Sequence, residues 1–130
     1  MDLDGLECKV LGKGNKERIV YLDTVTAMYL RNYLNSRKDT AEALFVNRYG
    51  HRFQTGGIRE MLVRLEEASG VDHVHPHKFR RTLATNMAKR GMPIQTIAKI
   101  LGHESIETTM KYVVMNHEDV KLKYRQYYAC

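Results

Sequence analysis

The chain of 130 residues is long enough to bury a hydrophobic core without disulfides or metal. Hydrophobic residues make up 43% and charged residues 28% of it, a composition that excludes a disordered tail. Lys and Arg number 21 against 15 for Asp and Glu, and this net charge of +6 favours an anionic partner, with nucleic acid as the first candidate.

Two short strands are predicted at the start of the chain, over residues 6–11 and 18–22. Residues 12–16 between them read Gly-Lys-Gly-Asn-Lys, which is typical of a turn and gives the hairpin a basic tip. Asp23 can cap the helix that follows. Residues 43–46 then predict a short extended segment.

Two longer helices are predicted in the middle of the chain. Apolar residues recur at helical spacing from Thr55 onward, and Gly70 supplies the stop. Pro76 suits the first turn of the next helix, which we expect to end near Gly91.

Three shorter helices complete the prediction. Pro93 opens the first, which ends at Gly102, and Ser105 caps the second. Asn116 starts the terminal helix, with two acidic residues in its first turn. The buried side of the second helix is predicted to consist of Ile106, Met110 and Val113. Tyr112 falls off this apolar stripe.

These elements predict one mostly helical α+β domain, in which a small antiparallel hairpin packs against a helical bundle. Cys8 and Cys130 lack metal-ligand spacing, so reduced thiols are expected, with a disulfide between them as the alternative. No stretch has the length and apolar character of a membrane span, and the N-terminus lacks the order of a signal peptide. A cytoplasmic protein is therefore expected.

The segment His77-Lys78-Phe79-Arg80 carries the first chemical signal. His77 and Arg80 are three residues apart and share a face in the first turn of the predicted helix. A helix start already attracts phosphate, and Arg80 could add a bidentate contact. The alternative is that His77 caps the helix and Arg80 is a surface residue, which is the preferred interpretation when the motif is taken alone.

A second signal comes from His103 and, nine residues beyond it, Tyr112. A tyrosine hydroxyl can act as a covalent nucleophile when cationic donors meet the developing charge, and His103 and Arg80 could be those donors. The alternative is a half-buried packing tyrosine, which is the interpretation for Tyr29, Tyr124 and Tyr127.

Lys13 at the hairpin tip is the third candidate, because flanking glycines let the backbone approach a ligand closely. Lys16 and Arg18 would then contact phosphates nearby. The alternative is an ordinary charged turn with solvating neighbours.

Together, the hairpin segment 12–18, His77-x-x-Arg80, Leu101-Gly102-His103 and Tyr112 resemble, in order and spacing, the tyrosine recombinases, which include phage integrases of mobile elements and Xer-type resolvases. The resemblance covers nearly the whole chain. It implies the recombinase catalytic-domain fold and site-specific recombination or integration of double-stranded DNA, by a bacterial or phage-encoded protein that needs neither metal nor nucleotide cofactor.

The resemblance also implies a role for each matched residue. Tyr112 would attack a DNA phosphodiester, forming a 3′-phosphotyrosyl link and releasing a 5′-hydroxyl. Arg80 would hold the nonbridging oxygens, with His77 beside it as hydrogen-bond donor and proton-transfer partner. His103 would stabilise the transition state, and Lys13 would protonate the leaving 5′-oxygen, because an alkoxide is a poor leaving group.

Further expectations concern DNA and partner subunits. Lys78 and Arg81, which flank the motif, join Lys16 and Arg18 as expected DNA contacts. The family assembles as a tetrameric synapse on DNA and often docks its terminal helix on an adjacent protomer, so a homo-oligomer is expected. Packing of that helix within its own domain is an equal alternative on the sequence.

One departure from the family pattern concerns a second catalytic arginine, which precedes the hairpin in an Arg-x-Ser-Glu type helix. The chain contains no such segment and no core-binding domain, so residues 1–130 are expected to be a partial catalytic domain. Loss of one such donor costs about two to three orders of magnitude in rate, which predicts a weakly active or inactive fragment.

Two alternatives remain open at this point. A nicking and religating enzyme like the type IB topoisomerases uses similar residues but relaxes DNA, and recombination between paired sites would distinguish the two. A DNA-binding module with a structural Tyr112 is the nonenzymatic alternative.

Overall fold

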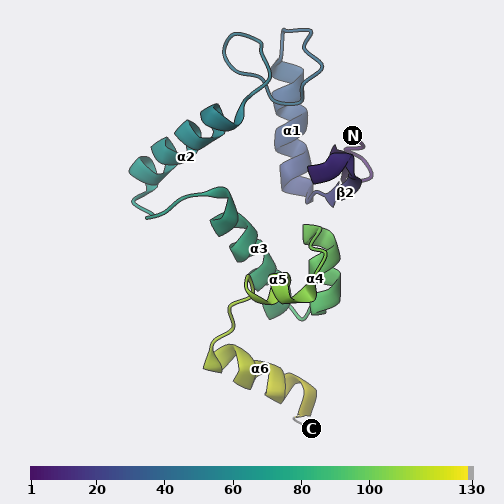
Figure 1. Ribbon diagram of the computed structural model, residues 1–130, viewed down its shortest axis with the longest axis vertical. Coiled ribbons are helices and arrows are strands. Elements are labelled where there is room, and N and C mark those ends of the chain that lie inside the picture. The colour runs from purple at the N-terminus through teal and green to yellow at the C-terminus, as the bar shows by residue number, and fades with distance from the viewer. Residues whose placement is uncertain (129–130) are drawn as a thin grey trace. The chain divides into compact units, whose positions relative to one another are not determined.

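The computed structural model describes residues 1–128, except for the side chain of Lys13, so Cys130 and any disulfide with it lie outside the described residues. Cys8 is a free thiol. The chain divides into two compact units, Met1–Ala68 and Ser69–Cys130. Figure 1 shows the order of a hairpin followed by helices, which confirms the mostly helical α+β class. The single catalytic domain over residues 1–130 stays a prediction.

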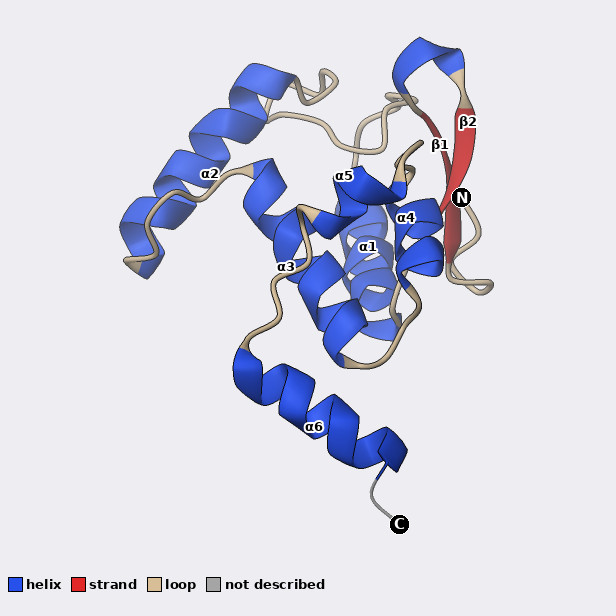
Figure 2. Cartoon of the chain, turned by 60° about the horizontal axis from the view of Figure 1, so that its bottom comes forward, coloured by secondary structure: helices blue, strands red, loops and turns tan. Residues whose placement is uncertain are grey.

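The predicted hairpin is confirmed. Strands β1 (Glu7–Leu11) and β2 (Glu17–Tyr21) are antiparallel, and they are the two red arrows in Figure 2. A 3₁₀ turn, η1 (Lys13–Asn15), joins them, and Gly14 takes a φ of 73°. Glycine adopts this left-handed conformation without the steric cost that a side chain would add. The tip therefore turns tightly where the sequence predicts it.

Helix α1 (Thr24–Ser36) begins where Asp23 predicts. The Asp23 carboxylate accepts a hydrogen bond from the amide of Thr26 at 2.6 Å. This bond satisfies one of the amides that a helix start leaves unpaired, and it lowers the pKa of Asp23. Ala27 is the buried residue of the helix.

The loop after α1 is organised by Arg37. Its guanidinium pairs with Asp39 and donates to three backbone carbonyls of the loop, at 2.7, 2.9 and 3.1 Å. The hydrogen bond from Arg37 lowers the pKa of Asp39 to about 2. The extended segment predicted over residues 43–46 is wrong: the chain bends there, because its carbonyls turn toward Arg37, and a bridge joins Val46 to Arg52.

Helix α2 (Thr55–Ser69) is confirmed, and Gly70 follows it with a φ of 66°. Leu62 is its buried residue. The other members of the predicted apolar stripe are more than a third exposed within the described chain: Ile58, Met61 and Leu65.

The second unit contains four helices in the predicted order: α3 (Pro76–Lys89), α4 (Ile94–Leu101), α5 (Ile106–Met110) and α6 (His117–Tyr128). Gly102 ends α4 with a φ of 68°, and its amide donates to carbonyls of the last turn. Ser105 caps α5 by accepting a hydrogen bond from the amide of Glu107.

The core of this unit lies between α3 and α4. Ala84 and Ile97 are fully buried and Leu101 is nearly so. Partly buried residues surround them: Met87, Ala88, Met92, Tyr112 and Val113. Tyr112 therefore packs on this core, at the end of α5.

The predicted buried stripe of α5 is wrong for Ile106 and Met110, whereas Val113 packs against the core as predicted. Ile106 is 41% and Met110 62% exposed, whereas Thr109 is fully buried. A polar residue can be buried when its hydroxyl has a partner, and Thr109 has one in His103. The helix therefore turns a threonine, not a methionine, toward the core.

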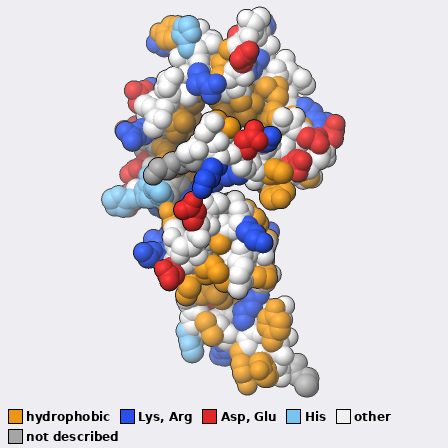
Figure 3. All heavy atoms as spheres, turned by 45° about the vertical axis from the view of Figure 1, so that its right-hand side comes forward, with side chains coloured by type: hydrophobic (Ala, Val, Ile, Leu, Met, Phe, Trp, Pro, Cys, Tyr) orange, Lys and Arg blue, Asp and Glu red, His pale blue; other side chains and the backbone are white. Residues whose placement is uncertain are grey.

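Helix α6 starts as predicted, since the side chains and amides of Asn116 and Asp119 exchange hydrogen bonds. Lys89 forms an ion pair with Asp119 at 3.1 Å, which joins α3 to α6. The apolar residues of α6 are more than half exposed: Val120, Leu122, Tyr124, Tyr127 and Tyr128. Figure 3 shows orange side chains on the surface at this end of the chain. No helix among the described residues could cross a membrane.

Candidate active site

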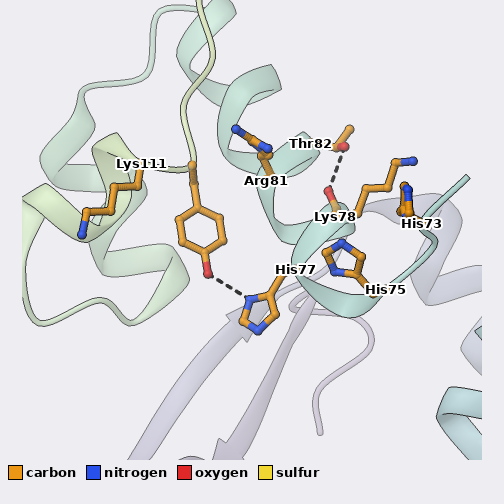
Figure 4. A pocket seen from close by; sticks show the side chains of 8 residues that line it. His73, His75, His77, Lys78, Arg81, Thr82 and Lys111 are labelled. Atoms are coloured by element: carbon orange, nitrogen blue, oxygen red, sulfur yellow. Dashed lines mark hydrogen bonds between the residues drawn. The ribbon is translucent and has the colours of Figure 1, made fainter.

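The hydroxyl of Tyr112 lies 2.9 Å from Nδ1 of His77, the dashed contact in Figure 4. His77 is in the first turn of α3, which begins at Pro76 because a fixed φ and a missing amide suit that position. The alternative in which His77 caps the helix is wrong, because His75 is the N-cap residue. The ring of His77 is thus directed to the tyrosine.

Arg80, one turn further along α3, faces the end of α4. Its Nε donates to Nε2 of His103 at 3.4 Å, and its Nη2 donates to the carbonyl of Leu101. Helices start at their positive end and finish at their negative end, so the last carbonyls of α4 attract this cation. Arg80 is half-buried, which contradicts the alternative of a plain surface residue.

His103 is placed by the left-handed turn of Gly102 that ends α4. Its Nδ1 lies 2.7 Å from Oγ1 of Thr109. Since Nε2 accepts from Arg80, the ring proton lies on Nδ1 and points to Thr109. The ring of His103 then faces that of Tyr112, with centroids 5.1 Å apart.

Tyr112 lies just after α5, and its amide donates to the carbonyl of Thr109 at 2.9 Å. Its ring is half-buried beside His77 and His103. Four predicted site residues thus meet within the second unit: His77, Arg80, His103 and Tyr112.

The sequence interpretation missed Thr109, which orients His103 and starts the turn to Tyr112. Its signal was spacing: positions 106, 109 and 113 are as compatible with one helical face as 106, 110 and 113. Because the prediction placed an apolar residue, Met110, on the buried face, it missed Thr109, whose hydroxyl contacts His103.

A basic pocket of about 530 Å³ opens beside His77 and Tyr112. None of its eight described lining residues is acidic; they are His73, His75, His77, Lys78, Arg81, Thr82, Lys111 and Tyr112. Figure 4 shows Lys111 on one side of it and His73, His75 and Lys78 on the other. Positive charge on both sides suits a phosphate chain.

Two predicted DNA contacts, Lys78 and Arg81, line this pocket. Lys78 also donates to the carbonyl of Asp72, which ties it to the loop before α3. Lys111 and the pair His73 and His75 were missed, although histidines at alternate positions up to His77 are a visible pattern. Among the described residues, no three potential ligands are placed to hold a metal ion.

Lys13, Lys16 and Arg18 belong to the first unit, in and beside the hairpin tip. The contacts among His77, Arg80, His103, Thr109 and Tyr112 all lie within the second unit. The functions of these three residues stay predictions.

The second unit thus brings a tyrosine hydroxyl together with an imidazole at hydrogen-bond distance, an arginine and a second histidine. A phenol attacks phosphorus when its proton has an acceptor and the negative charge on the phosphate has donors. The arrangement has the parts for covalent attack on a phosphodiester. Residues 1–119 also match the Phage integrase family.

The chain belongs to the phage integrase family. It is 36% identical over 121 residues to tyrosine recombinase XerC of Corynebacterium glutamicum. The aligned region covers 91% of the chain and 39% of that protein. It is 38% identical over 122 residues to tyrosine recombinase XerC of Leptospira interrogans, with the same coverage. The family member described here therefore spans less than half the length of these relatives.

Solved structures of recombinases share its fold. The crystal structure of XerA recombinase is similar, with 32% sequence identity and a TM-score of 0.85. The match covers 100% of the chain described here and 49% of the XerA chain. The structure of XerH bound to palindromic difH substrate has 21% sequence identity and a TM-score of 0.70. This match covers 95% of the chain described here and 36% of the XerH chain. The family assignment and the recombinase fold predicted from the motifs are confirmed.

Proposed function

We propose that this chain cuts and rejoins double-stranded DNA in site-specific recombination, with Tyr112 as the nucleophile. The observation that carries the proposal is the 2.9 Å contact between the Tyr112 hydroxyl and His77 beside a basic pocket. Family membership supports the same chemistry. The reaction would take place in the cytoplasm, where bacterial DNA is found.

In the first step, the Tyr112 oxygen forms a bond to phosphorus and the bond from phosphorus to the 5′-oxygen breaks. The tyrosine proton passes to Nδ1 of His77, which lies at hydrogen-bond distance. Arg80 turns its guanidinium away from His103 to the nonbridging oxygens, and His103, protonated on the Nε2 that Arg80 releases, adds a second donor beside it. Lys13 supplies the proton for the leaving 5′-oxygen.

In the second step, the 5′-hydroxyl of a partner strand attacks the same phosphorus and gives its proton to Lys13, which lost one in the first step. The bond to Tyr112 breaks, and the tyrosine oxygen recovers a proton from His77. One phosphodiester replaces another, so the exchange proceeds without an energy source or cofactor.

We infer that four further cations contact the DNA backbone: Lys16, Arg18, Lys78 and Arg81. Lys78 and Arg81 line the pocket beside the nucleophile, which supports direct phosphate contact. Each phosphate contact that is lost should lower the salt dependence of binding by about one unit of slope, without changing the sequence preference.

The test uses a suicide substrate, which is a DNA duplex with a nick near the exchange point. A suitable duplex is first selected from a randomised library by capturing the DNA that forms denaturant-resistant adducts with the protein. The natural-length protein and the 130-residue chain are each assayed as wild type, Tyr112→Phe and Tyr29→Phe. Tyr29 is an exposed tyrosine of α1 and serves as a matched control.

We expect adducts from wild type and Tyr29→Phe but none from Tyr112→Phe. An adduct that survives Tyr112→Phe, or none from the natural-length protein, contradicts the mechanism. Joining of two partner duplexes, not relaxation alone, separates recombination from a topoisomerase reaction.

We also propose a homo-oligomer on DNA, with a second copy of the chain covering α6. Support comes from the exposed apolar residues of this helix, such as Leu122 and Tyr124. Deleting the residues after Asn116 should then abolish higher-order complexes on DNA while leaving the monomer folded. A large loss of monomer stability would instead show that α6 packs within its own domain.

A further inference from the structure

Thr85 of α3 contacts the backbone on both sides of Val113, the residue that follows Tyr112. Its hydroxyl donates to the carbonyl of Tyr112 at 3.1 Å and accepts from the amide of Val114 at 3.2 Å. A hydroxyl is the smallest side-chain group that can donate and accept at once. One side chain therefore satisfies two backbone groups that no helix or strand pairs.

These bonds fall where regular structure ends. Helix α5 finishes at Met110, and the amides of Tyr112 and Val113 still reach back to the carbonyl of Thr109 at 2.9 and 3.2 Å. Beyond Val113, the hydroxyl of Thr85 continues the attachment of the segment. Thr109 fixes the chain entering the Tyr112 turn, and Thr85 fixes the chain leaving it.

The position of Thr85 links the Tyr112 backbone to other residues of the site. Thr85 lies on α3, the helix that also carries His77 and Arg80. Its neighbour Ala84 is fully buried in the core, so this part of the helix is held firmly. The backbone of Tyr112 is thereby tied to the same rigid element as the residue proposed to take its proton and the residue proposed to hold the phosphate.

We propose that Thr85 is a positioning residue for the cleavage reaction, which holds the Tyr112 backbone so that its hydroxyl reaches His77 and the phosphorus together. The inference rests on the proposed function of Tyr112. Thr85 has no part in binding DNA, and it acts through Tyr112 alone. A change at Thr85 should therefore alter the rate of the chemical step but not the affinity for DNA.

The experiment compares Thr85→Val, which keeps the shape but removes the hydroxyl, with Thr85→Ser, which keeps the hydroxyl. Single-turnover adduct formation and DNA affinity are measured in the natural-length protein on the captured suicide substrate. We expect Thr85→Val to slow adduct formation roughly 10- to 100-fold, since a displacement near 1 Å can cost about 100-fold. Thr85→Ser should restore the rate, and neither variant should change the affinity.

Thr96→Val is the matched control, because Thr96 is an exposed threonine of α4 away from Tyr112. It should react like the wild type. A wild-type rate for Thr85→Val, or equal losses for Thr85→Val and Thr85→Ser, overturns the positioning role while the Tyr112-dependent adduct stands. Absence of an adduct from the wild type would instead defeat the proposed function.

A second measurement covers the case in which Thr85→Val does not fold. Amide hydrogen exchange is followed in Thr85→Ala, which removes the hydroxyl without placing a methyl group in its position. The Val114 amide should exchange faster, while the Tyr112 amide, bonded to Thr109, keeps its protection. Unchanged exchange at Val114 overturns the proposal, because the tether would then not hold the segment.

Discussion

Nδ1 of His77 and the hydroxyl of Tyr112 lie 2.9 Å apart, although the two residues are 35 positions apart in the chain. The contact joins the first turn of α3 to the turn after α5. It puts an imidazole nitrogen at hydrogen-bond distance from the tyrosine hydroxyl, which is the geometry that proton transfer from a nucleophile requires.

Replacing His77 by Ala should slow strand cleavage by about 10²- to 10⁴-fold, the usual contribution of a positioned proton acceptor. DNA affinity should change little, since the imidazole acts on the tyrosine proton. Single-turnover cleavage and a binding titration check this. His51→Ala, an exposed histidine of the first unit, is the control and should cleave normally. Equal rates for the two variants would remove His77 from the mechanism.

Lys13→Ala should lose activity on ordinary DNA and recover it on DNA with a sulfur in place of the leaving 5′-oxygen. A thiol has a pKa of about 8.5 and leaves as a thiolate without a general acid. Cleavage rates on the two substrates give the answer. Lys16→Ala should weaken binding to both substrates alike. A Lys13→Ala defect of the same size on both substrates would mean that Lys13 binds DNA and does not protonate it.

Thr109→Val should slow cleavage about 10-fold and lower the free energy of unfolding by about 1 kcal/mol, the typical net contribution of one hydrogen bond. The physical reason is the lost bond to Nδ1 of His103, which leaves the imidazole free to rotate. Thr108→Val, on the exposed side of the same helix, is the paired control. If both variants lose stability but neither loses activity, Thr109 only supports the fold.

Asp39 should make the stability of the first unit sensitive to acid. Its pKa is about 2 in the folded chain, because of the hydrogen bond from Arg37, against about 3.9 when unfolded. Its contribution is therefore fully present above about pH 4 and lost as the pH falls toward 2. The Tm of Asp39→Asn should fall less steeply over this range than that of the wild type. Parallel curves, with Glu42→Gln as control, would show that the pair is not formed.

The hairpin and the helices could be predicted because their signals are local. Asp23 caps α1, and Gly70 and Gly102 end α2 and α4 through left-handed turns that the sequence marks. The segment over residues 43–46 could not be predicted in this way. Its bends depend on the reach of Arg37 to its carbonyls, and sequence spacing does not reveal that contact.

The four residues of the second-unit site could be named from their order and spacing, but their contacts could not. Tyr112 was expected to fall off the apolar stripe of α5, and its packing against the core between α3 and α4 was not predicted. Thr109 and Thr85 were not predicted, because a threonine on a helix is usually neutral. The partner of Thr109 lies across the turn between α4 and α5, and the partners of Thr85 lie 27 and 29 residues away. Short motifs identify the reacting groups, while tertiary hydrogen bonds decide which residues hold them.

The central claim is that Tyr112 carries the DNA. The most direct measurement is to digest the captured adduct with nuclease and protease and to locate the nucleotide on the peptides by mass spectrometry. We expect a nucleotide 3′-phosphate esterified to the hydroxyl of Tyr112. A nucleotide found on another tyrosine, such as Tyr124 or Tyr127 of α6, or on a serine, would contradict it.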